Sequence, residues 1–325
     1  MGGDFAPREN VVGAVEAARK LPGLDRITLV GDEPAIRNEL AAAGPTPAGV
    51  GILHATEVVR MDESPAIAIR RKRDNSISRA VDLVKRGEAD AMISAGNTGA
   101  VVVAATLKLR TLPGIDRPAI ATVMPTPVKP FVLIDAGANT DCSAQMLLQF
   151  AVMGSIYAQQ VLGSARPLVG LMSVGTEESK GNDTTKEAFR LLNESSLNFQ
   201  GNIEGRDLFE GVVDVAVCDG FVGNVVLKTS ESVGHAMGHW IREEFSRSPV
   251  RLLGALLLTR AIKAMKARLD PDLYGGAPLL GCNGVCIISH GASSAKAIYH
   301  AIRMARDSVR GRVNELITRT IGGAA

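Results

Sequence analysis

Five short segments of this chain combine glycine with asparagine, threonine, serine or aspartate, and each lies between an apolar run and a helical pattern. They are residues 95–99, 135–141, 175–176, 219–224 and 289–294. Such a segment places free backbone N–H groups and small hydroxyl or amide side chains at the start of a helix. Both the unpaired donors and the helix dipole favour an anion there. The pattern therefore predicts a phosphate-handling cleft.

Two side chains near these segments add charge or a hydrogen-bond donor. Lys180 lies in the polar loop Gly175–Asn182, which leads into a helical pattern over Asp183–Leu192. Its ammonium group would neutralise a phosphate, polarise a carbonyl, or serve only as a solvated loop lysine. Asn224 closes the segment 219–224, where its amide would either contact a ligand or cap a helix. Both residues remain candidates.

Several common catalytic motifs are absent from the sequence. It contains no G-x-G-x-x-G, no Walker-type G-x-x-x-x-G-K-[ST] and no G-x-S-x-G pattern. His235 and His239 are four residues apart but lack the glutamate of a zinc hydrolase motif, so packing or surface roles are favoured. Cys142 near a helix start is more typical of a buried thiol than of a nucleophile. The sequence thus predicts no cofactor and no metal site.

The elements that must position the candidates alternate between strand and helix patterns. Apolar runs typical of strands occupy 27–30, 91–94, 131–134, 168–174, 212–218 and 285–288, and helical patterns occupy 9–20, 35–43, 78–86, 98–110 and 143–161. This alternation predicts an α/β fold, with a mostly parallel sheet and helices on both faces. Ligands bind beyond the carboxyl ends of such strands, where we expect all five segments. The prediction is one α/β domain over 1–325, in one or two lobes, with a loop at the proline-rich stretch 124–130.

Composition and charge narrow the classes of partner. Aromatic residues make up 4% of the 325 residues, which disfavours a nucleic-acid stacking platform, and the net charge of +2 gives no global field. Basic residues are clustered, however, at Arg70, Arg71, Lys72 and Arg73, and again at Arg247, Arg251, Arg260, Lys263, Lys266 and Arg268. Each cluster is either a solvated face or a docking surface for an acidic partner.

The segment 248–269 combines a leucine-rich face with flanking arginine and lysine. It predicts one or two amphipathic helices within a segment of about 246–272, which either pack in a core or dimer or lie on anionic lipid. No apolar run approaches the ~20 residues that a membrane span needs. Four cysteines without paired C-x-x-C motifs favour reduced thiols in the cytoplasm.

The motifs, taken together, resemble the PlsX family of bacterial acyl-ACP:phosphate acyltransferases. The resemblance runs in order along nearly the whole chain. It rests on residues 1–7 (MGGDFAP), 93–100 (ISAGNTGA), 114–118 (GIDRP), 135–139 (DAGAN), 174–177 (VGTE), 180–182 (KGN), 219–224 (DGFVGN), 274–277 (YGGA) and 290–291 (HG). Three departures stand out: the family's first strand, before Met1, is missing; Ala292 follows His290-Gly291 where the family favours serine; and Lys296 replaces asparagine.

The resemblance implies transfer of a fatty acyl group from acyl-carrier protein to inorganic phosphate, giving acyl phosphate for phospholipid synthesis. It also implies a homodimer with an isocitrate/isopropylmalate-dehydrogenase-like fold and peripheral membrane contact through 248–269. Lys180 and Asn224 match the family's proposed catalytic pair. The rival functions are an acetyl-CoA:phosphate transferase of related fold, a dehydrogenase and a membrane-surface scaffold.

We expect direct attack of phosphate on the thioester, because phosphate is a competent nucleophile and a thioester is an activated acyl donor. Lys180 and Asn224 would then stabilise the oxyanion, and His290 would protonate the leaving thiolate. The remaining predicted substrate contacts, for phosphate or the acyl group, are Ser94, Gly96, Asn97, Thr98, Asp135, Asn139, Gly175 and Thr176. The acidic acyl-carrier protein would dock on Arg70–Arg73.

Overall fold

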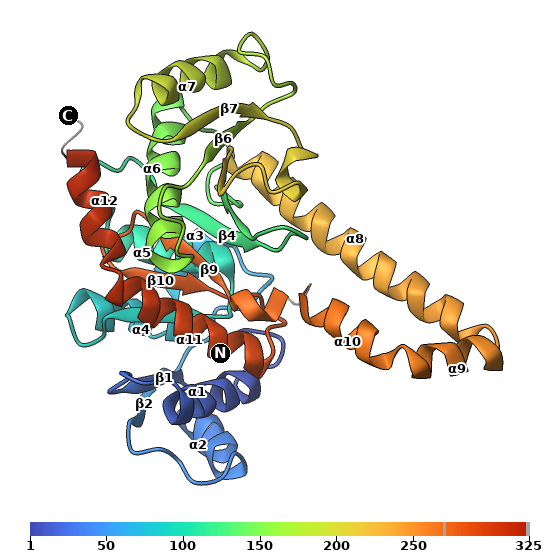
Figure 1. Ribbon diagram of the computed structural model, residues 1–325. Helices are drawn as coiled ribbons and strands as arrows, with labels where there is room; N and C mark the ends of the chain where they lie inside the picture. The colour runs from blue at the N-terminus through green and yellow to red at the C-terminus, as the bar shows by residue number, and fades with distance from the viewer. Residues whose placement is uncertain (269–270, 323–325) are drawn as a thin grey trace.

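The computed structural model describes residues 1–268 and 271–322, and it consists of an α/β body from which an arm of helices projects (Figure 1). The strands are β1 (Ile27–Gly31), β2 (Val50–His54), β3 (Ala91–Ser94), β4 (Ala119–Met124), β5 (Phe131–Ile134), β6 (Val169–Met172), β7 (Phe199–Ile203), β8 (Val215–Val217), β9 (Ala277–Leu280) and β10 (Val285–Ile288). The α-helices are α1 (Arg8–Lys20), α2 (Glu33–Ala42), α3 (Pro65–Arg71), α4 (Ser76–Lys85), α5 (Thr98–Lys108), α6 (Ala144–Val161), α7 (Asp183–Glu194), α8 (Gly220–Ser246), α9 (Pro249–Leu257), α10 (Thr259–Arg268), α11 (Ala295–Arg310) and α12 (Val313–Gly322).

The main sheet has eight strands in the order β3-β10-β9-β4-β5-β8-β6-β7, and β1 and β2 form a separate parallel pair. Neighbouring strands toward both ends of the main sheet are parallel. In its middle, β9 and β4 pair antiparallel with each other and with their outer neighbours. The prediction of an α/β fold with a mostly parallel sheet is therefore confirmed. The sequence patterns do not reveal β4 or β9, which reverse the strand direction halfway across the sheet.

Helices cover both faces of the sheet because alternate strand residues point to opposite sides. On β8, Val215 and Val217 point into a core that includes α6, whereas Ala216 points into a core that includes the start of α8. β10 is covered in the same way by α11 on one face and by α4 and α5 on the other. Both faces are thus buried, as the continuous aliphatic runs of these strands require.

Most predicted small polar residues at the helix starts act as caps. Their side chains accept a hydrogen bond from the backbone of the helix that they precede, at Asn97, Asn182, Asp219 and Ser294 among others. Capping supplies partners for donors that a helix start leaves unpaired. Asn224 is not a cap, because α8 begins at Gly220 with Asp219 as its capping residue.

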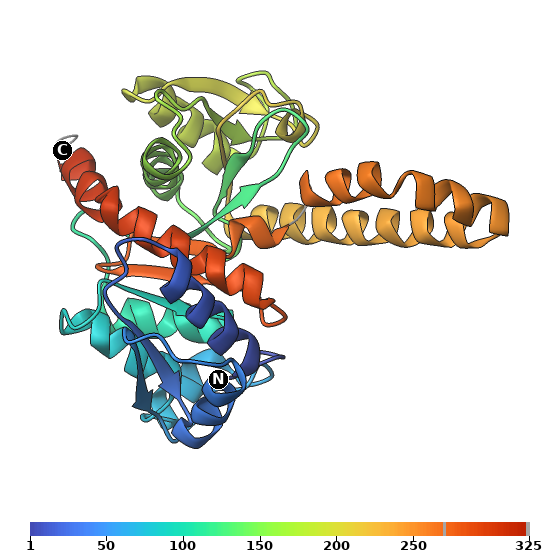
Figure 2. The ribbon, with the colours of Figure 1, turned by 60° about the horizontal axis from the view of Figure 1, so that its bottom comes forward.

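Helix α8 extends well beyond the body, and α9 and α10 run back toward the body beside it (Figures 1 and 2). We call residues 231–268 the helical arm. The segment 248–269 contains α9 and α10, whereas Leu269 and the side chains of Lys266 and Arg268 lie outside what the structure describes. Large exposed apolar side chains on the arm are Val233, Met237, Trp240, Ile241, Val250, Leu252, Leu253, Leu256, Leu257, Leu258 and Met265. Among the described residues, no helix has the length and apolar character needed to cross a membrane.

Candidate functional site

Strand direction divides the five small-residue segments into two groups. β3 and β10 run in one direction and lead into the segments 95–99 and 289–294. β5, β6 and β8 run in the other direction and lead into 135–141, 175–182 and 219–224. Each of the five segments follows the carboxyl end of a strand, as predicted, but the antiparallel strands β9 and β4 lie between the two parallel parts, so the two groups follow strands of opposite direction.

The segment after β5 is folded around the carboxylate of Asp135, which is fully buried. Its oxygens accept hydrogen bonds from the backbone N–H groups of Ile120, Gly137, Ala138 and Asn139 and from the Asn139 amide, at 2.7–3.2 Å. Burial raises the pKa of Asp135, although the hydrogen bonds from Ala138 and Asn139 act to lower it. Asp135 therefore shapes the turn, and the Asn139 amide is also occupied by the Pro118 carbonyl at 2.8 Å.

The start of α8 packs against this turn through glycine. A Cβ on Gly223 would lie 1.9 Å from the Asp135 carbonyl oxygen, and one on Gly220 would lie 2.6 Å from the Asn139 carbonyl oxygen. The Gly220 N–H donates to that Asn139 oxygen at 2.6 Å. Asn224, one residue after Gly223, is exposed and borders Gly137, whose Cβ would lie 3.6 Å from the Asn224 amide oxygen. The close approach thus holds Asn224 beside the Asp135 turn with its amide accessible.

The loop after β6 carries Lys180. Gly175 is buried beneath the loop, and a Cβ there would lie 2.8 Å from Cγ of Lys180. Thr176 and Lys180 are exposed, and no hydrogen bond or ion pair of the Lys180 ammonium occurs within the described residues. Gly181 has a φ of +100°, and a Cβ on it would lie 2.1 Å from the Thr185 hydroxyl. The two glycines therefore fix a short loop that presents an unpaired cation.

A cavity of about 350 Å³ lies at the carboxyl ends of β6 and β8. One wall is formed by Leu171–Val174 and by Gly181, Asn182, Thr184 and Thr185, and a second by the start of α8. Residues 140–142 and the start of α6 close the third side. The loop that carries Lys180 and the helix that carries Asn224 therefore border one cavity. The residues that follow the Asp135 turn border it as well.

Cys142 lines this cavity together with Cys218. Burial raises the pKa of the Cys142 thiol to about 12, and the nearby Asp135 carboxylate acts in the same direction. A thiol with such a pKa is protonated near neutral pH, so it is a poor nucleophile and a poor metal ligand. The arrangement offers no activated cysteine, in agreement with the prediction of an unreactive thiol.

The segment after β3 uses most of its polar groups within the fold. The amide oxygen of Asn97 accepts the Ala100 N–H at 3.0 Å, and its nitrogen donates to the carbonyl oxygens of Arg60, Met61 and Glu63 at 3.1–3.3 Å. The Ser94 hydroxyl accepts the Gly96 N–H at 3.2 Å. Thr98 is exposed at the first position of α5, where the backbone N–H has no partner within the helix. Thr98 is thus the accessible member of this segment.

His290, after β10, belongs to the same edge of the sheet as Thr98. Its ring is exposed, and Nδ1 accepts the Ala292 N–H at 3.2 Å. The adjacent Gly291 carbonyl oxygen accepts the Asp4 N–H at 2.8 Å. A Cβ on Gly3 would lie 2.6 Å from the Ala95 carbonyl oxygen. The first residues of the chain therefore fill the space between the segments after β3 and β10.

The basic cluster 70–73 lies at the end of α3. Lys72 is held inward by Glu63 Oε2 at 2.6 Å and by the Val58 carbonyl oxygen at 2.7 Å. Arg70, Arg71 and Arg73 are exposed, and none has an ion pair within the described residues. Three of the four predicted docking side chains therefore face solvent.

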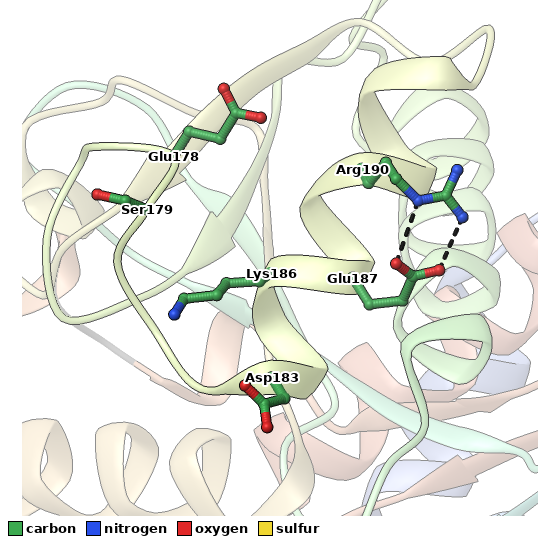
Figure 3. Close-up of a pocket in the computed structure, with 6 residues that line it drawn as sticks. All are labelled: Glu178, Ser179, Asp183, Lys186, Glu187 and Arg190. Atoms are coloured by element: carbon green, nitrogen blue, oxygen red, sulfur yellow. Dashed lines mark hydrogen bonds and ion pairs between the residues drawn. The ribbon is translucent and has the colours of Figure 1, made fainter.

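A second, more open hollow of about 600 Å³ lies between the Lys180 loop and α7. In Figure 3, Lys186 extends into the space between the loop and the helix, while Glu187 and Arg190 pair with each other along α7. Acidic and basic side chains of this hollow alternate, and its Arg190 is occupied by Glu187 and Glu194. It does not have the composition of a dedicated phosphate site.

Sequence reasoning missed three polar residues that border the 350 Å³ cavity, namely Ser173, Thr184 and Thr185. The Ser173 hydroxyl oxygen is buried and has no hydrogen-bond partner among the described residues. Thr184 and Thr185 follow the cap residue Asn182, whose side chain accepts the Thr185 N–H at 2.8 Å. The sequence does contain one indication of these residues, because the capping residue Asn182 lies two positions after Lys180 and immediately before the helix that carries Thr184 and Thr185. A capping residue by itself, however, does not predict a cavity.

Solved structures with a similar fold are phosphotransacylases. A phosphotransacetylase from Streptococcus pyogenes superposes with a TM-score of 0.66 at 21% identity, covering 94% of this chain and 92% of the other. A branched-chain phosphotransacylase from Enterococcus faecalis gives a TM-score of 0.57 at 16% identity, covering 95% and 96%. At these identities the likeness establishes the fold.

The sequence relatives are much closer. A phosphate acyltransferase from Pelotomaculum thermopropionicum is 53% identical over 323 residues, covering 99% of this chain and 93% of that protein. One from Geobacter sulfurreducens is 49% identical over 315 residues, covering 97% and 90%. The family model described as fatty acid synthesis protein matches residues 1–316. The chain therefore belongs to this fatty acid synthesis protein family.

Proposed function

We propose that this protein transfers a fatty acyl group from acyl-carrier protein to inorganic phosphate, which yields acyl phosphate for phospholipid synthesis. The observation that carries the proposal is the cavity at the ends of β6 and β8. Its walls include the loop of Lys180 and the start of α8, which bears Asn224. Relatives about half identical over nearly the full chain bear the name phosphate acyltransferase.

The reaction needs no covalent enzyme intermediate. A phosphate oxygen forms a bond to the acyl carbon of the thioester, the carbon–sulfur bond breaks, and the leaving sulfur takes a proton to become the free thiol of acyl-carrier protein. The high pKa of Cys142 supports this direct route, because no thiolate is available beside the cavity to accept the acyl group.

Lys180 and Asn224 stabilise the negative charge that develops on the carbonyl oxygen. The exposed ammonium of Lys180 and the accessible amide of Asn224 both supply donors that no described residue occupies. Gly175 and Thr176 position the same loop. Preorganised donors at an oxyanion are worth about 10²–10³ in turnover each.

Phosphate approaches from the start of α5. Thr98 and the unpaired N–H groups of the first turn are the donors that we assign to it, with Ser94 and Gly96 shaping the turn. Asn97 acts by holding residues 60–63, since its amide is fully used. The start of α5 is connected to the region of Asn224 through Leu227, one turn after Asn224 on α8. It packs against the core cluster at the start of α5 and also against the one beneath β5 and β8. We assign to His290 the transfer to the leaving sulfur of the proton that the attacking hydrogen phosphate releases.

The acyl-carrier protein docks on Arg70, Arg71 and Arg73, because these exposed cations have no carboxylate partner within the described residues. Reversing their charge should raise the KM for acyl-carrier substrate and leave the KM for a small acyl thioester unchanged. Equal changes in both constants would contradict the docking role.

The helical arm gives the protein a second surface. Its exposed leucines and flanking basic residues suit either a second copy of the chain in a homodimer or an anionic membrane. We assign both contacts to the arm, with the chain otherwise in the cytoplasm.

The proposal is tested by thiol release from long-chain acyl-ACP with and without inorganic phosphate. Release should depend on phosphate, and acyl phosphate should accumulate in equal amount. Lys180→Ala should reduce turnover by about 10²-fold or more without lowering the melting temperature. Lys186→Ala, which removes an exposed lysine on the adjoining α7, is the matched control. Phosphate-independent release, or full activity in Lys180→Ala, would contradict the assignment.

A further inference from the structure

The most buried side chains that line the 350 Å³ cavity are apolar apart from the Ser173 hydroxyl, whereas the rim is polar. Leu147, Leu171 and Cys218, all nearly or fully buried, line it in depth, and Met172 and Val222 lie beside them. Asn182, Thr184 and Thr185 contribute the polar side. A pocket with an apolar interior and a few polar groups at its mouth is typical of a site for a largely apolar ligand.

The ionisable side chains that line the cavity disfavour an anionic occupant. Among the residues that the structure describes, no lysine or arginine lines it, whereas the carboxylates of Asp141 and Asp219 do. A phosphate or nucleotide group would be repelled there, while a hydrocarbon carries no charge and gains free energy when it leaves water. The volume holds about a dozen groups of the size of a water molecule, which is close to the size of a methylene group.

We propose that this cavity receives the part of the acyl chain next to the thioester carbonyl, and that Met172 and Thr184 set which chains it accepts. The inference rests on the proposed acyl transfer. The carbonyl lies at the mouth, between the Lys180 loop and Asn224, and the methylene groups extend inward toward Leu147 and Leu171.

Substitutions at Met172 and Thr184 can change the volume of the cavity with little loss of folding stability. Met172 ends β6 and is partly exposed. Thr184 occupies the second position of α7 and is partly exposed, and its hydroxyl has no hydrogen bond within the described residues. The buried residues at the back of the cavity do not offer this freedom, because shortening them opens voids in the core.

The experiment measures kcat/KM for phosphate-dependent thiol release from acyl-ACP donors that range from butyryl to palmitoyl. Thr184→Leu adds bulk to the cavity and should lower kcat/KM for the longest donors by about 10- to 200-fold relative to butyryl, the discrimination that lost space in an apolar pocket produces. Met172→Ala adds space and should shift the preference toward longer or branched chains. Thr184→Val, which keeps the volume and removes only the hydroxyl, should leave the profile unchanged.

The outcomes separate this inference from the function on which it rests. If the unchanged protein releases no thiol in response to phosphate with any donor, the proposed acyl transfer fails. If it is active but Thr184→Leu and Met172→Ala keep the parental chain-length profile, the acyl site lies elsewhere. Equal loss with all donors in Thr184→Leu would also overturn the inference, as would a changed profile in Thr184→Val. Melting curves of each variant identify any loss that comes from unfolding.

Discussion

The two halves of α8 differ sharply although they form one continuous helix. In the first half, Gly220 and Gly223 have no room for a Cβ, because the Asp135 turn presses on the helix backbone. In the second half, Gly234 and Gly238 have nothing within 4 Å of the place where a Cβ would be. The first half packs against the body through Gly220 and Gly223, and the second half projects from it (Figure 1).

This difference indicates how one helix serves two purposes. The part that is fixed by close packing holds Asn224 in place, which suits chemistry that depends on position to within a fraction of an ångström. The part that projects exposes Met237 and Trp240 and leads to the leucines of α9, which suits association with another surface. Changes in the first half should therefore affect turnover and stability, whereas changes in the second should affect binding.

The largest expected effect is on catalysis, from Asn224→Ala. We expect kcat to fall by about 10²–10³-fold, because the variant loses one donor to the developing oxyanion. The melting temperature should not fall, since the side chain is exposed and α8 has its cap at Asp219. Lys228→Ala, one turn further along α8 and also exposed, is the matched control and should keep parental turnover. An equal loss of kcat in both variants would contradict a specific role of the Asn224 amide in catalysis.

The next effect is on stability, from alanine at two glycines of the same helix. Gly223→Ala should lower the free energy of unfolding by about 3 kcal/mol or more, because its methyl group meets the Asp135 backbone at 1.9 Å. Gly234→Ala should raise it by up to about 1 kcal/mol, since alanine favours the helix and the site is open. Denaturant unfolding monitored by circular dichroism measures both. Similar values for the two variants would mean that the first half is not as constrained as its packing indicates.

A smaller effect is expected on association, from the double change Leu256→Ser and Leu257→Ser on α9. These side chains are 65% and 80% exposed, so their loss should not unfold the protein. Binding to anionic vesicles or formation of dimers should weaken by about tenfold or more, because exposed apolar area is removed. Vesicle co-sedimentation and light scattering distinguish the two partners.

The control for this change is Leu107→Ser, which alters a leucine of α5 that is 69% exposed on the body. It should leave both vesicle binding and mass unchanged. Turnover with a short-chain soluble thioester should stay parental in both proteins. If the α9 variant binds vesicles and self-associates as before, the projecting half of the helix has no role in association.

The sequence predicts those strands and helices that are marked by a local pattern of residues. Aliphatic runs followed by glycine and small polar residues locate β3, β5 and β10 and the helices after them, because a buried strand and a helix cap both leave a short-range signal. The leucine-rich stretch 248–269 likewise predicts α9 and α10.

What the sequence does not predict depends on contacts between distant residues. β4 and β9 have the same apolar composition as parallel strands, so nothing local indicates that they pair antiparallel and separate the five segments into two groups. The approach of Gly223 to Asp135 joins residues 88 positions apart in the chain, and it appears only when β5 and β8 lie side by side. The hydrogen bonds of Asn97 to residues 60–63 also join distant parts of the chain, so no local pattern predicts them.

The smallest expected effect concerns Cys142, which packs at the start of α8. Because burial raises the pKa of its thiol to about 12, only about one molecule in ten thousand carries the thiolate at pH 8. Alkylation of Cys142 by iodoacetamide, followed by mass spectrometry, should therefore accelerate about tenfold with each pH unit from 8 to 11, without the plateau near pH 9 of a free thiol. Cys142→Ala should retain phosphate-dependent turnover of the short butyryl donor within about threefold, since a direct attack by phosphate does not use this side chain. A large loss of turnover together with a plateau near pH 7 would instead indicate an acyl-cysteine intermediate, and the first half of α8 would then serve to activate a nucleophile as well as to position Asn224.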